Sequence, residues 1–222
     1  MRRVLVIAAH MDDEVLGVGG TIAKHVEAGD AVTVCIVCKR AYHHAFDPKL
    51  IAEEEAATLR AAKVLGYSDV RFLRLRDELL DERLLDVIIP IEACVTEVRP
   101  DTVYTHHRGD SNQDHRAVFS ASVVACRSIA SHRVPRLLCY EVLSSTEQAP
   151  PFPEFCFQPN YYVNIKPFLS QKIEAMKAYE RESRAFPHPR SAKGIEVLAA
   201  KRGMEIGLEA AEAHLLLRDV WN

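Results

Sequence analysis

Near its start the chain passes from a short apolar run straight into a cluster of acidic side chains. Residues 4–9 read VLVIAA, and His10, Asp12, Asp13 and Glu14 follow at once. The run has the composition of a buried strand, and such a strand would end at lower cost in Gly or Asn than in three carboxylates that repel one another. The cluster therefore indicates a bound cation, and a divalent metal is the favoured candidate.

Strand-like and helix-like segments alternate along the rest of the chain. Strands are expected over residues 2–9, 31–38, 69–75, 102–105 and 136–143, and helices over 14–28, 50–65, 79–98 and 115–129. Beyond residue 143 the pattern predicts short strands within 155–165, helices over 166–184 and 192–208, and a last strand over 213–220. The alternation predicts an α/β fold with a mostly parallel sheet, helices on both faces and a short C-terminal elaboration. With 222 residues and no long linker, a single domain over residues 1–222 is expected.

The balance of charge excludes some classes of partner. The formal net charge is −3 and acidic and basic residues are interspersed, so nothing indicates a nucleic-acid footprint or a polybasic membrane surface. No stretch approaches the roughly 20 apolar residues of a membrane-spanning helix, and the opening apolar run is too short for the core of a signal peptide. A cytoplasmic protein is therefore expected.

Cys35 and Cys38 form a C-x-x-C pair inside the second expected strand. A redox or zinc pair needs both sulfur atoms on one side, whereas strand side chains three positions apart point to opposite faces. Both cysteines are therefore predicted to be core residues, where a free thiol behaves as a small hydrophobic group.

A second polar segment, residues 106–115 with the sequence HHRGDSNQDH, follows the fourth expected strand. Sites in an open parallel sheet lie at the carboxyl ends of the strands. The first and fourth strands are commonly neighbours in a doubly wound sheet, so the two polar segments are expected to meet.

The residue types in these two segments suit a catalytic zinc site, which needs about three protein ligands and an open position for water. His10 and Asp13 are the candidates from the first segment. His115 is favoured from the second because, like Asp13, it lies at a helix start, and His106 and His107 stay as alternatives.

Other polar residues of the two segments have less defined roles. Asp12 lies beside the expected metal without needing to bind it, which is the position of a general base in metal-assisted hydrolysis. Glu14 either supports a ligand or places charge favourably at a helix N-terminus. Arg108 is either a substrate clamp or a surface salt-bridge residue. Asp114 is positioned to orient a neighbouring imidazole or guanidinium.

The two segments resemble the motifs of a known family. AHMDDE at residues 9–14 resembles the A-H-P-D-D-E signature of the LmbE-like, or PIG-L, zinc N-deacetylases, and NQDH at 112–115 resembles that family's H-x-D-H motif. Segments 141–147, 186–191 and 201–213 are also similar to parts of some bacterial members. The resemblance implies a Rossmann-like fold, a PIG-L-like deacetylase domain and zinc-dependent removal of an N-acetyl (N-acyl) group, with release of acetate, from a glucosamine-containing small molecule or conjugate.

The resemblance also implies a set of site residues. His10, Asp13 and His115 correspond to the ligands of one zinc ion per chain, with another divalent transition metal as the alternative, and Asp12 corresponds to the general base. Asn112 stands where many members have a histidine, and an amide can donate a hydrogen bond to an oxyanion but cannot carry a proton. His188, between two prolines, is our candidate for the missing acid. The expected partner is a small amino-sugar substrate, and because family members often assemble, a homo-oligomer is allowed.

Two other functions fit parts of the pattern. A metal-binding homologue without catalysis is compatible with the Asn112 substitution. A nucleotide-binding enzyme on the same fold is less favoured, because a G-x-G-x-x-G fingerprint is absent and the glycines after residue 16 fall inside a helical pattern.

Overall fold

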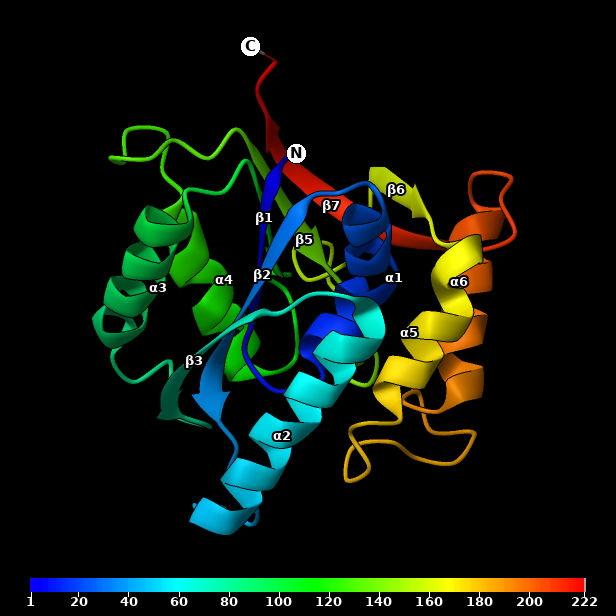
Figure 1. Cartoon of the computed structure of the whole chain (residues 1–222), viewed down its shortest axis with the longest axis horizontal. Coiled ribbons are helices and arrows are strands. Elements are labelled where there is room, and N and C mark those ends of the chain that lie inside the picture. The colour runs from blue at the N-terminus through cyan, green and yellow to red at the C-terminus, as the bar shows by residue number, and fades with distance from the viewer. Residues whose placement is uncertain (222) are drawn as a thin grey trace.

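A seven-stranded sheet runs through residues 1–221, the part of the chain that the computed structural model describes (Figure 1). The strands are β1 (Arg3–Ala8), β2 (Ala31–Lys39), β3 (Asp69–Arg76), β4 (Thr102–His106), β5 (Arg136–Tyr140), β6 (Tyr161–Asn164) and β7 (Ala211–Asp219). Their order across the sheet is β3-β2-β1-β4-β5-β7-β6. The first five are parallel, whereas β7 runs antiparallel between β5 and β6. The predicted α/β class with a mostly parallel sheet is confirmed.

Helices cover both faces of this sheet (Figure 1). One layer contains α1 (Asp13–Glu27), α2 (Pro48–Leu65), α5 (Leu169–Met176) and α6 (Ala192–Met204), and the other contains α3 (Leu84–Val98) and α4 (Gln113–Ala125). Strand β1 explains why its sequence is apolar without interruption. Val4 and Val6 pack into the core beneath α1 and α2, while Leu5 and Ile7 pack into the core beneath α3 and α4. A parallel strand that is buried on both faces needs apolar residues at every position.

Several predicted boundaries were too long. The expected helix over 79–98 begins at Leu84, and the one expected over 166–184 is a short 3-10 turn followed by α5, which ends at Met176. Strand β5 ends at Tyr140 because the chain turns: Thr146 Oγ1 accepts from the Val142 N–H at 2.8 Å, and the Thr146 N–H donates to the Val142 carbonyl. This turn matters later, since it forms one wall of the candidate site.

The two cysteines are buried in the core, as predicted, but the prediction that their side chains point to opposite faces of the strand was wrong. Cys35 and Cys38 are free thiols that are at most 2% exposed. They do not point to opposite faces, however, since both residues belong to the core beneath α3 and α4. The pairing of β2 with β3 is irregular beside Cys38, and its extra residue lies in β3, between Phe72 and Leu75.

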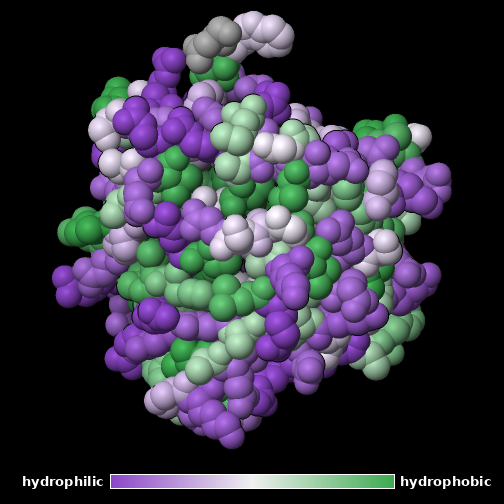
Figure 2. Space-filling model, viewed as in Figure 1, coloured by the Kyte–Doolittle hydropathy of each residue, from purple (hydrophilic) through white to green (hydrophobic). Residues whose placement is uncertain are grey.

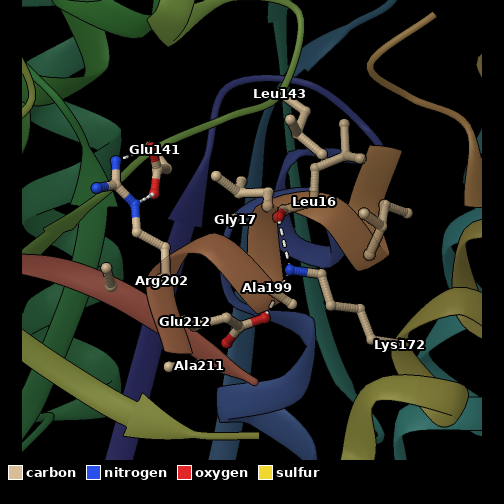
Figure 3. Close-up of a pocket in the computed structure, with 12 residues that line it drawn as sticks. Leu16, Gly17, Glu141, Leu143, Lys172, Ala199, Arg202, Ala211 and Glu212 are labelled. Carbon is tan, nitrogen blue, oxygen red and sulfur yellow. Dashed lines mark hydrogen bonds and ion pairs between the residues drawn. The ribbon is translucent and has the colours of Figure 1, made fainter. Parts of the chain in front are cut away.

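An ion pair interrupts α1 near its middle (Figure 3). Val18 has non-helical dihedral angles, φ −137° and ψ 17°. In an unbroken helix the Gly20 N–H would donate to the Leu16 carbonyl. Instead, Lys172 Nζ donates to the Leu16 carbonyl at 2.8 Å, and Glu212 Oε1 accepts from the Gly20 N–H at 2.8 Å and from Lys172 at 2.7 Å. The pair takes the place of one helix hydrogen bond and fixes the first turns of α1 against α5 and β7.

Among the described residues, no helix has both the length and the hydropathy needed to cross a bilayer. On the face seen in Figure 2, hydrophilic residues cover most of the surface and hydrophobic residues show between them as separate patches.

Candidate active site

The two polar segments meet where the connections of the sheet change direction. β1 and β4 are paired neighbours, with Val4 opposite Thr102 and Val6 opposite Tyr104. The chain leaves β1 for α1 on one face and leaves β4 for α4 on the other. Such a switch point leaves a crevice at the carboxyl ends of the two strands. A cavity of about 300 Å³ with mostly polar lining lies there.

Three predicted ligand atoms lie together at the base of this cavity. His10 Nδ1 is 3.2 Å from His115 Nε2 and 3.4 Å from Asp13 Oδ2, and His115 Nε2 is 3.3 Å from the same Asp13 oxygen. Ligand atoms of a tetrahedral zinc ion with ordinary bond lengths are separated by about 3.3 Å. The three side chains are at most 4% exposed. Their donor atoms therefore form one face of a tetrahedron that could hold a divalent ion and leave its fourth position toward the cavity.

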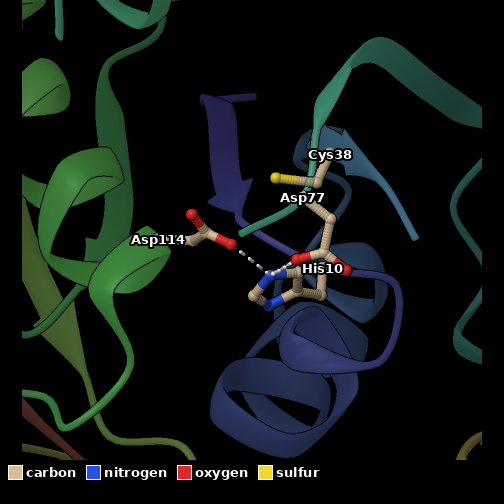
Figure 4. A group of neighbouring side chains, drawn as sticks. All are labelled: His10, Cys38, Asp77 and Asp114. Carbon is tan, nitrogen blue, oxygen red and sulfur yellow. Dashed lines mark hydrogen bonds and ion pairs between the residues drawn. The ribbon is translucent and has the colours of Figure 1, made fainter. Parts of the chain in front are cut away.

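The outer nitrogen of each imidazole faces a carboxylate. His10 Nε2 lies 3.0 Å from Asp77 Oδ1 and 3.2 Å from Asp114 Oδ2 (Figure 4), and His115 Nδ1 lies 3.2 Å from Asp110 Oδ2. This arrangement is typical of metal-binding histidines, because the carboxylate fixes the tautomer and the ring orientation. Burial alone would lower the pKa of His115, but Asp13 and Asp110 outweigh it and raise the pKa to about 9. The site thus holds protons that a cation of higher charge would displace.

A second group of potential ligand atoms shares His10. The donor atoms of His10, Cys38, Asp77 and Asp114 lie within 4.8 Å of one another (Figure 4). Burial raises the pKa of the Cys38 thiol to about 11, which disfavours the thiolate in the metal-free site. The Asp114 carboxylate also accepts from the N–H groups of Glu78 and Leu80. This group therefore supports His10 rather than forming a separate site.

The alternative imidazoles of the second segment are already engaged. His106 Nε2 accepts from the Ala9 N–H at 2.8 Å, and burial lowers the pKa of this ring to about 4, so it stays neutral. Its ring stacks on His115 with 4.0 Å between the centroids. His107 Nε2 contacts the Phe155 carbonyl at 3.1 Å. His106 thus packs beneath the proposed ligands, and His107 points toward another loop.

Asp12 reaches the cavity from a strained backbone position. Its φ of 118° lies in a region that favours glycine, and strain of this kind gathers at functional sites. Glu14 Oε2 accepts from the Asp12 N–H at 3.2 Å, and Tyr179 donates to Glu14 Oε1, which together hold the turn. Burial raises the pKa of Asp12 to about 7, with the Arg190 guanidinium opposing the rise. The Asp12 carboxylate can therefore exchange a proton near neutral pH.

The structure does not bring His188 to the site. Its side chain is exposed, its Nδ1 accepts from the Arg190 N–H at 3.1 Å, and it does not line the cavity. Arg190 takes the place that we had expected for the histidine: Nη1 donates to Asp12 Oδ2 at 3.2 Å and to Glu182, and Nε donates to Ser144 Oγ at 2.6 Å. The 186–191 loop thus reaches the cavity through Arg190 and not through His188.

Two further predicted residues have structural partners. Arg108 is exposed and donates to the Glu154 carbonyl at 2.9 Å, outside the cavity, so its placement gives no support to a substrate clamp. Asn112 lines the cavity as the N-terminal cap of α4, where its Oδ1 accepts from the Asp114 N–H at 2.8 Å and the His115 N–H at 3.4 Å. This cap fixes the helix start that holds His115 in place.

Asp77 and Asp110 are supporting residues that the sequence interpretation missed. Asp77 directly follows β3, and its Oδ2 accepts from the Ala41 N–H at 2.9 Å. Asp110 accepts from Thr146 Oγ1 at 2.6 Å and from Ser145. Asp77 could have been found from the sequence, because it is a carboxylate at the end of a third expected parallel strand. Asp110 was visible in the second segment but had no assigned partner.

Comparison with known proteins identifies similar sequences. Residues 5–126 match the family model PIG-L, described as GlcNAc-PI de-N-acetylase. An uncharacterized deacetylase, YaiS, of Escherichia coli K12 is 30% identical over 183 residues, which cover 80% of this chain and 90% of YaiS. A probable N-acetyl-α-D-glucosaminyl L-malate deacetylase 2 of Bacillus subtilis is 28% identical over 192 residues, which cover 81% of this chain and 83% of that protein.

A similar fold is found among solved structures. The N,N′-diacetylchitobiose deacetylase of Pyrococcus horikoshii superposes with a TM-score of 0.79 and 20% identity, over 97% of this chain and 84% of the other. A likeness at this level of identity concerns the fold alone.

Proposed function

The chain belongs to the PIG-L family of de-N-acetylases, and from that premise we propose that it removes the acetyl group from an N-acetylglucosamine unit of a small molecule or conjugate and releases acetate. It is an amide-cleaving hydrolase, as its relatives are. The B. subtilis relative is named for a glucosaminyl malate substrate, which supports a GlcNAc-containing substrate here as well. One observation carries the proposal: three donor atoms at tetrahedral spacing lie beside a buried carboxylate that none of them engages.

In this proposal His10, Asp13 and His115 hold one Zn²⁺ per chain, with another divalent transition metal as the alternative. The spacing of their donor atoms and the carboxylates behind both imidazoles fit such an ion. A bound zinc ion supplies Lewis-acid chemistry, because it polarises a carbonyl group and lowers the pKa of water. Asp77, Asp110 and Asp114 keep the imidazole donor atoms aimed at one point.

Asp12 is the proposed general base. It takes a proton from the water whose oxygen attacks the acetyl carbonyl carbon, and this proton then passes to the nitrogen as the C–N bond breaks. Asn112 cannot supply that proton and His188 lies outside the cavity, so Asp12 performs both transfers. Burial raises the pKa of the Asp12 carboxyl above its ordinary value, which favours its return of the proton to the leaving nitrogen. The products are acetate and the free amine.

Acetate release from methyl 2-acetamido-2-deoxy-glucosides, with and without added zinc, tests the proposal. Asp12→Asn should lose acetate release and keep its metal content, whereas His115→Ala should lose both. His188→Ala is the control and should retain the rate. Full activity of Asp12→Asn would show that the base is assigned wrongly. Failure of the zinc-loaded chain to release acetate from any N-acetylglucosamine derivative would overturn the function itself.

A further inference from the structure

A second cavity, apolar where the first is polar, opens next to the candidate active site. It has a volume of about 350 Å³ and lies between the 186–189 loop, α6 and the turn after β5. Its apolar lining includes Val142, Leu143, Phe186, Val197 and Leu198. Phe186 is 65% exposed and Val197 is 52% exposed. We call this cavity, as defined by these five residues, the apolar groove.

The apolar groove and the polar cavity are two compartments with a shared wall. Val142 lines both. Ser144 and Arg190 line the polar cavity, while their chain neighbours Leu143 and Pro189 line the groove. Arg190 Nε donates to Ser144 Oγ at 2.6 Å and so joins the two segments at the boundary. A molecule whose amide lies against the metal-site residues would enter the groove by crossing this boundary formed by Ser144 and Arg190.

The charged residues around the groove already have partners within the protein. Glu141 pairs with both nitrogens of the Arg202 fork at 2.7 Å. Glu147 accepts from the N–H groups of the adjoining turn, and Lys201 Nζ pairs with Glu205 Oε1 at 2.6 Å. The groove thus offers apolar surface and no uncommitted charge among its described lining residues. A carboxylate or phosphate would lose water there without gaining a partner.

We propose that the apolar groove holds a neutral, apolar aglycone carried by the amino sugar. The inference rests on the proposed function and adds a substrate class to it: glycosides with an alkyl or aryl group rather than an acidic one. The acyl group removed in the proposed reaction is acetyl, which is too small to fill the groove, so the occupant lies on the sugar side of the scissile amide. Each fully buried CH₂ group adds about fourfold in affinity.

The test compares methyl, butyl and hexyl glycosides of N-acetylglucosamine, in both anomers, with the zinc-loaded full-length chain. We expect kcat/KM for the hexyl glycoside to exceed that for the methyl glycoside by at least about tenfold, since two or three buried CH₂ groups suffice. Val197→Asp places a charge in the groove and should bring this ratio close to one, and Val197→Ala should lower it by less. Val123→Asp is the matched control, because Val123 is 38% exposed on α4 in the opposite layer, and it should leave the ratio unchanged.

The other outcomes separate this inference from the proposed function. If methyl glycosides are hydrolysed but the hexyl-to-methyl ratio is near one, the groove proposal fails and the deacetylase stands. If no glycoside is hydrolysed, calorimetry compares the binding of the hexyl and methyl glycosides. Hexyl glycoside binding that is at least about tenfold tighter, and that loses this advantage in Val197→Asp, supports the groove proposal. Equal binding of the two glycosides overturns it. If N-hexanoyl-glucosamine is hydrolysed faster than N-acetylglucosamine while the hexyl glycoside shows no gain over the methyl glycoside, the groove proposal is overturned, because the groove then holds the acyl chain. Light scattering shows whether Val197→Asp dissociates an oligomer. If it does, and the hexyl-to-methyl ratio of kcat/KM stays unchanged, the groove proposal is overturned in favour of a subunit interface.

Discussion

Replacing Lys172 by methionine tests whether the ion pair inserted into α1 holds that helix in place. The Lys172 and Glu212 side chains are 4% and 5% exposed, and they meet at 2.7 Å. Methionine keeps most of the apolar volume but leaves the Glu212 carboxylate without its cation and the Leu16 carbonyl without its donor. Removing one partner of a buried ion pair costs about 3–5 kcal/mol. Glu212 keeps two backbone donors, so we expect the free energy of unfolding to fall by about 3 kcal/mol, at the lower end of that range.

Urea unfolding followed by circular dichroism, on metal-free protein at pH 7, measures this loss. The double variant Lys172→Met/Glu212→Gln should be more stable than Lys172→Met alone, because it removes the unpaired buried charge. Lys193→Met is the control: Lys193 pairs with Glu196 on the surface, with side chains 62% and 46% exposed, and should cost less than about 1 kcal/mol. A loss for Lys172→Met no larger than that of the control would refute the reasoning.

Three further changes probe the site and the core. Asp110→Asn should weaken zinc binding about 10–100-fold in a competition titration, because the Asp110 carboxylate orients the His115 ring. Arg190→Met should move the acidic limb of the pH profile of kcat/KM to higher pH, because the guanidinium now opposes the raised pKa of Asp12. Burial lowers the pKa of His214 to about 4, so the unfolded chain takes up a proton below about pH 6.5 that the folded chain refuses. His214 should then contribute a loss of stability of about 3 kcal/mol between pH 6.5 and 4 in urea titrations, and His214→Leu should make the total loss smaller by that amount.

The central strands could be predicted because their burial requires a visible composition. VLVIAA is apolar at each position since β1 alternates its side chains between two cores. The meeting of the two polar segments followed from the general order of doubly wound sheets, and β1 does pair with β4. The direction of Cys38 could not be predicted, since strict alternation places it opposite to Cys35 and no glycine or proline in the strand signals a departure from that alternation.

The residues that line the cavity from the C-terminal third were harder to predict. The 186–191 loop packs against the site, but which of its side chains enters depends on the path of the whole segment after α5. His188 accepts the backbone N–H of Arg190 and stays outside, while the guanidinium reaches Asp12 and Glu182. The sequence shows that both side chains could take part in a polar site. Only their contacts with distant residues decide which of them enters the cavity.

Asp12 and Asp13 show how adjacent, identical side chains come to differ. Burial works against both charges, but the imidazoles of His115 and His106 hold the pKa of Asp13 well below its usual range, whereas burial dominates at Asp12 and raises its pKa to about 7. The Asp12 carboxylate contacts the Arg190 guanidinium, whereas the Asp13 carboxylate contacts the imidazoles of the site. Two carboxyl groups with pKa values driven apart in one site are the usual basis for dividing labour between charge stabilisation and proton transfer. The acidic cluster that ends the first strand is therefore better explained as two separate roles than as one pool of negative charge.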